Sequence, residues 1–294
     1  MRKMTMLKFA LFVLLYCLFA YMVTAKPFTA FNVKVSGKGQ PIIFIPGATC
    51  SGDEWNETIA KYNSKYQCHV LTLAGYAGVA PLTKAPYLSE IKHQIEDYIT
   101  SNKLENVIVV GHSIGGVLGM WIAAENKVSL GKVVVVDAMP FFALAQNPAA
   151  ADTFSEAMAK GMLERYNTMD DKTLLAQQKM TAKFMCLDST RWDLIANWGL
   201  KSDKKTMAYT MTEMLGMDLR KKIASIACPV LVLAAYNPVP EYPGFTKEMV
   251  SQTFGEQYKN CSKCILHVAD GGCKHFIMYD APKWFYSELD NFFN

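Results

Sequence analysis

The sequence predicts an α/β fold, in which helices cover both faces of a mostly parallel central sheet and a helical cap is inserted. Up to residue 138, short apolar runs rich in β-branched residues alternate with longer segments of helical periodicity. Strand-like runs are absent between residues 139 and 222 and return after that segment. Because strand–helix alternation is typical of parallel sheets, we assign residues 26–138 and 223–294 to the core and residues 139–222 to the cap.

The elements of the core follow from periodicity and length. Apolar runs predict strands at residues 31–35, 42–45, 68–73, 107–110, 133–136, 229–235 and 264–268. Apolar residues at helical spacing predict helices at residues 55–62, 88–101, 113–124 and 282–293. The run at 133–136 consists of valine alone, as expected for a strand buried on both faces.

The first residues predict an export signal. Arg2, Lys3 and Lys8 precede an apolar run over residues 9–23, and Ala25 ends a V-x-A pattern. This order is typical of a secretory signal peptide, cut here after Ala25. The alternative is an uncleaved membrane anchor, since the apolar run is close to the minimum for a span. Either way we expect an exported protein, periplasmic or extracellular, that meets a membrane only through this segment.

Charge and cysteine usage exclude several classes of function. The net charge of +4 comes without a long basic run, which argues against nucleic acid as a partner. No second cysteine pair and no histidine pair completes a zinc site, so we expect neither a metal nor another cofactor. Cys261, Cys264 and Cys273 lie close together, and their pattern favours a structural disulfide or unpaired thiols over a redox site.

Ser113 is the candidate nucleophile. It lies in the motif G-H-S-I-G, residues 111–115, between a predicted strand and a predicted helix. That context places a serine on a sharp turn above the carboxyl edge of a sheet, next to a helix N-terminus that favours negative charge. Two backbone N–H groups must then stabilise an oxyanion. We expect them at Ile114, directly after the serine, and at Ala48 in the P-G-A-T loop, residues 46–49.

His275 is the candidate base among the five histidines. His69 and His267 lie in predicted strands, His93 lies on a helix, and His112 is expected to point away from the adjacent serine. His275 instead follows the last predicted strand and a glycine turn, and precedes the final helix. A loop histidine at this edge of the sheet can reach Ser113.

These features together resemble the α/β-hydrolase superfamily over essentially the whole mature length. The matching segments are the P-G loop at residues 46–47, the elbow at residues 111–115, the cap, and the K-H-F-x-x-x-D-x-P segment around His275. The stretch L-T-L-A-G-Y-A-G, residues 71–78, resembles a subset of exported bacterial hydrolases.

The resemblance implies a triad acid after the strand that follows the cap, but Asn237 stands there. Some members of the superfamily carry the acid after the preceding strand, where this chain has Asp137. We therefore choose Asp137 as the acid, with Asp270 and Glu241 in reserve. The alternative is that Asp137 only caps a turn.

The predicted function is hydrolysis of a small or medium, apolar carboxylic ester through an acyl-enzyme. We expect the substrate pocket to be lined by Thr49, Met139, Phe141 and Phe142. The cap is rich in methionines, and although most of them pack a core, the others make the pocket adaptable. One alternative is an amidase or aminopeptidase on the same scaffold. The acidic pair at residues 170–171 is better explained as a helix start than as an amine-binding patch. The other alternative is a non-catalytic ligand-binding or sensor protein, for which Asn237 is the best support.

Overall fold

A computed structural model describes residues 28–146, 153–242 and 244–294. The predicted export signal, residues 1–25, lies outside these residues. Among the helices in the described part of the chain, none is both long and apolar enough to span a bilayer.

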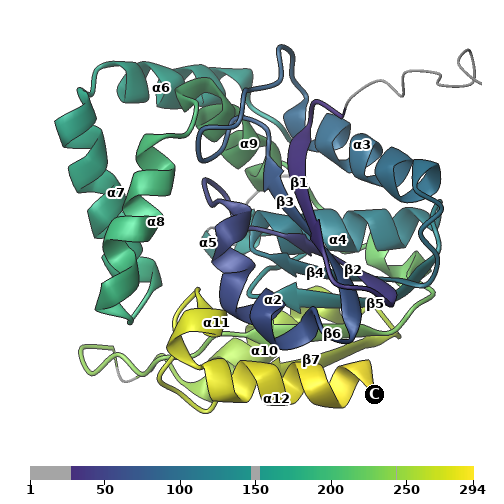
Figure 1. Ribbon diagram of the computed structural model, residues 1–294. Helices are drawn as coiled ribbons and strands as arrows, with labels where there is room; N and C mark the ends of the chain where they lie inside the picture. The colour runs from purple at the N-terminus through teal and green to yellow at the C-terminus, as the bar shows by residue number, and fades with distance from the viewer. Residues whose placement is uncertain (1–27, 147–152, 243) are drawn as a thin grey trace, which may run out of the picture.

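The core is a 7-stranded sheet with the strand order β1-β3-β2-β4-β5-β6-β7 (Figure 1). Its strands are β1 (Phe31–Ser36), β2 (Gln40–Ile45), β3 (Tyr66–Leu73), β4 (Val107–His112), β5 (Leu130–Val136), β6 (Val230–Ala234) and β7 (Cys264–Val268). Only β1 is antiparallel to its neighbour among the paired strands, and the other pairs are parallel. The predicted mostly parallel sheet is thus confirmed.

Helices cover both faces of this sheet because its central strands are apolar on both sides. Ile43 and Ile45 of β2 pack into the cluster beneath one helical layer, and Ile42 and Phe44 into the cluster beneath the other. The first layer consists of α3 (Tyr87–Ser101), α4 (Ile114–Glu125) and α10 (Lys247–Tyr258). The second consists of η1 (Gly52–Trp55), α2 (Asn56–Tyr62), α11 (Ile277–Asp280) and α12 (Pro282–Phe293). Helix α10 was not predicted from the sequence.

The helical insertion lies between β5 and β6 and projects beside the carboxyl edge of the sheet (Figure 1). It contains α5 (Ala143–Gln146), α6 (Glu156–Asn167), α7 (Asp171–Met185), η2 (Ser189–Arg191), α8 (Trp192–Leu200), α9 (Lys204–Leu215) and η3 (Lys222–Ser225). Helix α7 packs against α8, and α6 against α9. Asp170 accepts a hydrogen bond from the N–H of Thr173, so the acidic pair does begin a helix.

The cysteines near the C-terminus are divided between a bridge and a free thiol. Cys261 and Cys264 form a disulfide between α10 and β7, with an S–S distance of 2.16 Å. Cys273 is buried and free. The C-x-x-C spacing therefore closes a turn at the edge of the core.

Candidate active site

The carboxyl ends of the parallel strands surround a cavity of about 450 Å³. Loops after β2, β4, β5, β6 and β7 reach it from the core, and helices of the insertion close it from the other side. Ser113, His275 and Asp137 all line this cavity, as does Asn237. The structure therefore brings the three sequence-predicted catalytic side chains to one place.

Ser113 lies on a strained turn between β4 and α4. Its φ and ψ angles are 54° and −121°, a combination that side chains disfavour and that persists only where the surroundings enforce it. The N–H of Ser113 donates to the carbonyl of Val136 at 2.9 Å, which anchors the turn to β5. A Cβ at Gly111 would lie 2.2 Å from the carbonyl oxygen of Gly115, and one at Gly115 would lie 2.3 Å from that of Ile45. The flanking glycines are thus required by the close approach of strand and helix.

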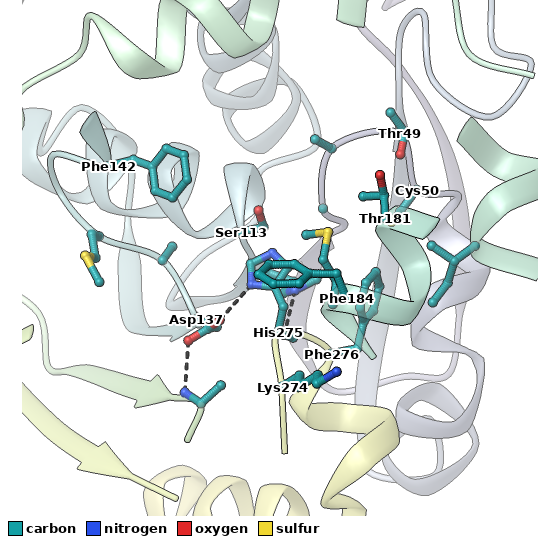
Figure 2. A pocket seen from close by; sticks show the side chains of 18 of the residues that line it. Thr49, Cys50, Ser113, Asp137, Phe142, Thr181, Phe184, Lys274, His275 and Phe276 are labelled. Atoms are coloured by element: carbon teal, nitrogen blue, oxygen red, sulfur yellow. Dashed lines mark hydrogen bonds and ion pairs between the residues drawn. The ribbon is translucent and has the colours of Figure 1, made fainter. Parts of the chain in front are cut away.

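Asp137 is the carboxylate that reaches His275. Its Oδ2 lies 2.7 Å from Nδ1 of His275, and its Oδ1 accepts the N–H of Ala235 at 2.9 Å. Both oxygens are therefore held, and the residue itself has a positive φ of 48°. In Figure 2 the imidazole of His275 lies between Asp137 and Ser113, with the contact to Asp137 dashed. Asn237 donates to the carbonyl of the following Pro238 at 3.3 Å.

The two reserve acids lie elsewhere. Asp270 forms an ion pair with Lys247, and its side chain is 93% exposed. Glu241 is also exposed. Neither lines the cavity among the described residues. Of the acids weighed from the sequence, Asp137 is the one that contacts the histidine.

The loop after β2 passes directly beside the serine. A Cβ at Gly47 would lie 2.8 Å from Nδ1 of the buried His112, so a side chain there would displace that ring. Ala48 follows and lines the cavity. Ile114 is the first residue of α4, whose opening N–H groups have no acceptor within the helix. The two predicted oxyanion donors thus belong to segments that adjoin Ser113.

Most of the predicted pocket residues line the cavity, but Phe141 does not. Thr49, Met139 and Phe142 are in its wall. Phe141 is buried away from it, with its backbone N–H and C=O bonded to the amide of Gln257 and the guanidinium of Arg220 5.0 Å from its ring. Neighbouring residues in this turn face opposite ways, which the sequence pattern does not reveal.

The insertion contributes several side chains that were not singled out from the sequence. They are Gln178, Thr181 and Phe184 of α7 and Ile195 of α8, and they stand beside three of the cap methionines expected at the pocket, Met185 of α7 and Met211 and Met214 of α9. Apart from the amide and the hydroxyl, these side chains are apolar. Figure 2 shows Phe142 and Phe184 on either side of Ser113. The cavity is thus an apolar space with a polar floor at the strand ends.

Two further polar residues at the floor were missed. His112 lines the cavity with its ring beside that of His275, the two ring centroids being 4.5 Å apart. Its Nδ1 lies 3.1 Å from Oε1 of the buried Glu54. Cys50 also lines the cavity, but burial and the charge of Glu54 raise its pKa well above the ordinary range. Its thiol therefore stays protonated and does not compete as a nucleophile.

The loop that carries His275 is bonded to the end of α7. Phe276 N–H donates to the carbonyl of Met185 at 3.2 Å. One oxygen of Asp280 accepts the N–H groups of Leu187 and Asp188 at 2.9 and 3.1 Å, and its other oxygen accepts the N–H of Lys274 at 2.9 Å. The insertion is thereby joined to the residue that precedes His275.

Distant relatives by sequence carry hydrolase names. The pimeloyl-[acyl-carrier protein] methyl ester esterase of Vibrio atlanticus is 24% identical over 205 residues, covering 68% of this chain and 76% of that protein. The enzyme of the same name from Vibrio cholerae is 25% identical over 211 residues, with the same coverages. A probable lysophospholipase of Arabidopsis thaliana, BODYGUARD 5, is 30% identical over 123 residues, which is 38% of this chain and 27% of that protein.

Solved structures share the fold at low sequence identity. The enol-lactonase of Burkholderia xenovorans superposes with a TM-score of 0.71 at 14% identity, covering 90% of this chain and 96% of that chain. The esterase EaEST of Exiguobacterium antarcticum gives a TM-score of 0.70 at 15% identity, covering 90% and 97%. The sequence profile of the Alpha/beta hydrolase family matches residues 42–288. That span covers most of the chain, so the protein belongs to the Alpha/beta hydrolase family.

Proposed function

We propose that the protein is a serine carboxylesterase in which Ser113 is the nucleophile, His275 the base and Asp137 the acid. The observation that carries the proposal is the 2.7 Å contact of Asp137 with His275 Nδ1, at the cavity where Ser113 occupies its strained turn. The distance supports a hydrogen bond that fixes the tautomer of His275, so that its Nε2 is the nitrogen left to act as base.

The reaction is acyl transfer in two steps. His275 takes the proton of Ser113, whose oxygen attacks the ester carbonyl while the amides of Ala48 and Ile114 hold the developing negative charge. His275 then protonates the leaving alcohol, leaving an acyl-serine. Water, deprotonated by His275, attacks the acyl group, and His275 returns that proton to the oxygen of Ser113 as the bond to the acyl group breaks and the acid leaves. Asp137 stabilises the imidazolium that forms in each step.

The substrate that fits is an ester of a small or medium, apolar acyl group. The cavity volume is within the range of small-molecule sites, and its walls from the insertion are mainly apolar. Methionine and phenylalanine on these walls can adapt to chains of different length. The names of the Vibrio relatives, which are methyl ester esterases, support a small leaving alcohol.

The carboxylate at Asp137 also bears on the two alternatives. A non-catalytic sensor would have no need of a carboxylate held by two hydrogen bonds against His275, which weighs against that alternative despite Asn237. An amidase would use the same residues, and only a comparison of substrates separates it from an esterase.

A serine-directed fluorophosphonate probe tests the proposal. Wild type should be labelled, and Ser113→Ala should not. A series of p-nitrophenyl esters from acetyl to decanoyl then gives the chain-length preference, and matched p-nitroanilides give the ratio of ester to amide cleavage. We expect esters to be cleaved at least 100-fold faster. A wild type that is neither labelled nor active on esters contradicts the proposal, and faster anilide cleavage favours the amidase.

A further inference from the structure

A buried ion pair lies directly beneath the proposed catalytic residues. Glu54, in the short helix η1, and His112, the last residue of β4, are each 1% exposed. Oε1 of Glu54 lies 3.1 Å from Nδ1 of His112. Charged side chains are rarely buried unless they are paired and hydrogen-bonded. The position of this pair behind Ser113, rather than at the surface, requires an explanation.

The pair contacts two separate loops of the site. The second carboxylate oxygen of Glu54 accepts the N–H of Gly47 at 3.4 Å, in the loop that carries Ala48. Nε2 of His112 lies 3.0 Å from the backbone carbonyl of His275. The two loops follow different strands, β2 and β7, and His112 itself directly precedes the serine. One buried pair thus joins the oxyanion loop, the nucleophile turn and the loop of the base.

The two contacts of His112 require a proton between its Nδ1 and the carboxylate of Glu54, in addition to the proton on Nε2. Both ring nitrogens face acceptors, whereas a neutral imidazole has one N–H donor. Burial alone would lower the pKa of His112, but the charge and hydrogen bond of Glu54 outweigh it and raise the pKa, with Asp137 adding to the effect. Cys50, Tyr279 and His275 are the other titratable groups that face the pair. A charged, doubly bonded His112 is therefore held rigidly.

We propose that Glu54 and His112 are positioning residues. They hold the N–H of Gly47 and the backbone carbonyl of His275 at fixed positions relative to Ser113. This inference rests on the proposed esterase function. It assigns no chemical step to the pair. Its role is to keep the base and the oxyanion loop at the distances that acyl transfer needs, because small displacements of reacting groups lower rates steeply.

The consequence is a loss of turnover with little loss of substrate binding. The acyl chain is held by the walls from α7, α8 and α9, none of which contains Glu54 or His112. Removal of the pair should therefore lower kcat by about 100-fold, the scale of a 1 Å misplacement. KM should change by less than about 3-fold, since the contacts that bind substrate and transition state equally are unaffected.

The main test is the double variant Glu54→Leu/His112→Leu. Both partners are replaced together because one left alone would be an uncompensated buried charge, whereas apolar replacement of a whole pair is often tolerated. His69→Leu is the matched control. His69 is also a buried histidine at a strand, bonded to the hydroxyl of Tyr98 at 2.7 Å, but it lies away from the cavity. We expect the double variant to lose kcat and the control to keep it.

Glu54→Gln separates geometry from charge. Its amide can donate to Nδ1 of a neutral His112 and accept the N–H of Gly47, so that His112 still donates to the His275 carbonyl. We expect kcat to fall less than about 5-fold, since the positions are kept. A folded double variant with wild-type kcat overturns the proposal, and so does a Glu54→Gln variant as damaged as the double variant. If the double variant does not fold, Glu54→Gln/His112→Leu replaces it, since it also leaves no buried charge, with an expected loss of about 10-fold.

A measurement without turnover keeps this proposal separate from the esterase proposal. The side-chain ¹⁵N resonances of His275 report its tautomer and hydrogen bonds. They should shift in the double variant and stay in place in His69→Leu. Unchanged His275 resonances in the double variant overturn the positioning role even if the enzyme is active. A wild type that lacks both labelling and activity overturns the esterase function, and the resonances then decide the positioning role alone.

Discussion

The two sides of the cavity at the strand ends are built differently. On the sheet side, Thr49, Ser113 and Asp137 line it from loops with positive φ angles of 64°, 54° and 48°. On the insertion side, Phe184 and Met211 line it from regular helices, and Phe184 is 80% exposed. Strained backbone held by its surroundings fixes positions, whereas flexible side chains on helices can adapt. The sheet side is thus suited to chemistry, and the insertion side to selection of the substrate.

The largest loss of activity is expected from a substitution on the sheet side, at Asp137. Asp137→Asn keeps the shape of the side chain, but its amide group favours the wrong tautomer of His275. We expect kcat on p-nitrophenyl butyrate to fall by about 10³- to 10⁴-fold, with KM nearly unchanged. Circular dichroism and thermal unfolding serve as the control for folding. A loss of less than 10-fold would mean that Asp137 is not the acid.

A second variant tests whether the acid can move between neighbouring strands. Strand β6 is paired with β5, and Asn237 in the loop after β6 lines the same cavity. In the double variant Asp137→Asn/Asn237→Asp, a carboxylate returns to the site from that loop. We expect activity about 10- to 100-fold above the single variant and below wild type, because electrostatic stabilisation of His275 is restored without optimised geometry. Equal activities of the single and double variants would show that the loop after β6 cannot present an acid to His275.

Asp280 is the residue at which the two sides meet. Asp280→Asn replaces one acceptor oxygen by an N–H₂ group, which opposes the N–H groups of Lys274 or Leu187. We expect kcat to fall by about 10-fold, since His275 follows Lys274 directly. Asp290→Asn is the control: Asp290 accepts from the hydroxyl of Tyr62 at 2.7 Å on the outer helix α12. A kcat loss shared by both variants would point to general loosening of the fold.

The smallest loss of activity is expected from a substitution on the insertion side. Phe184→Ala removes part of the apolar wall. Because burial of a few methylene groups is lost, kcat/KM for octanoyl esters should fall by about 3- to 10-fold, while kcat/KM for acetyl esters stays the same. Met180→Ala is the matched control, since Met180 is 73% exposed on the same helix and is not part of the wall. An equal loss on both esters would place Phe184 in the chemistry rather than in selection.

The strand-end side of the site was the more predictable one from sequence. Each catalytic candidate follows a run of apolar residues, and the flanking glycines mark turns that only a bare backbone can make. These signals are local, so Ser113, Ala48 and His275 were placed in the right loops. The family membership expected from them is confirmed. The catalytic roles of these residues stay predictions.

Contacts between distant segments were not predictable in the same way. Glu54 and His112 are 58 residues apart, and nothing local indicates that a glutamate before Trp55 is buried. Phe141 and Phe142 are adjacent and chemically alike, and only tertiary packing decides that Phe142 faces the cavity. Asp137 was chosen over Asn237 through the resemblance to relatives, since both follow buried strands.

The hydrogen bonds from the His275 loop to the end of α7 limit how freely parts of this protein can be exchanged. Phe276 N–H donates to the backbone carbonyl of Met185, and the ammonium group of Lys274 donates to the backbone carbonyl of Lys183 at 3.0 Å. A chimera that takes α6 to α9 from another family member must present backbone groups at the same places, or the loop that carries His275 loses its bonds to the insertion. Transplanting substrate preference into this scaffold therefore requires moving the segment from Lys274 to Asp280 together with the helices it supports.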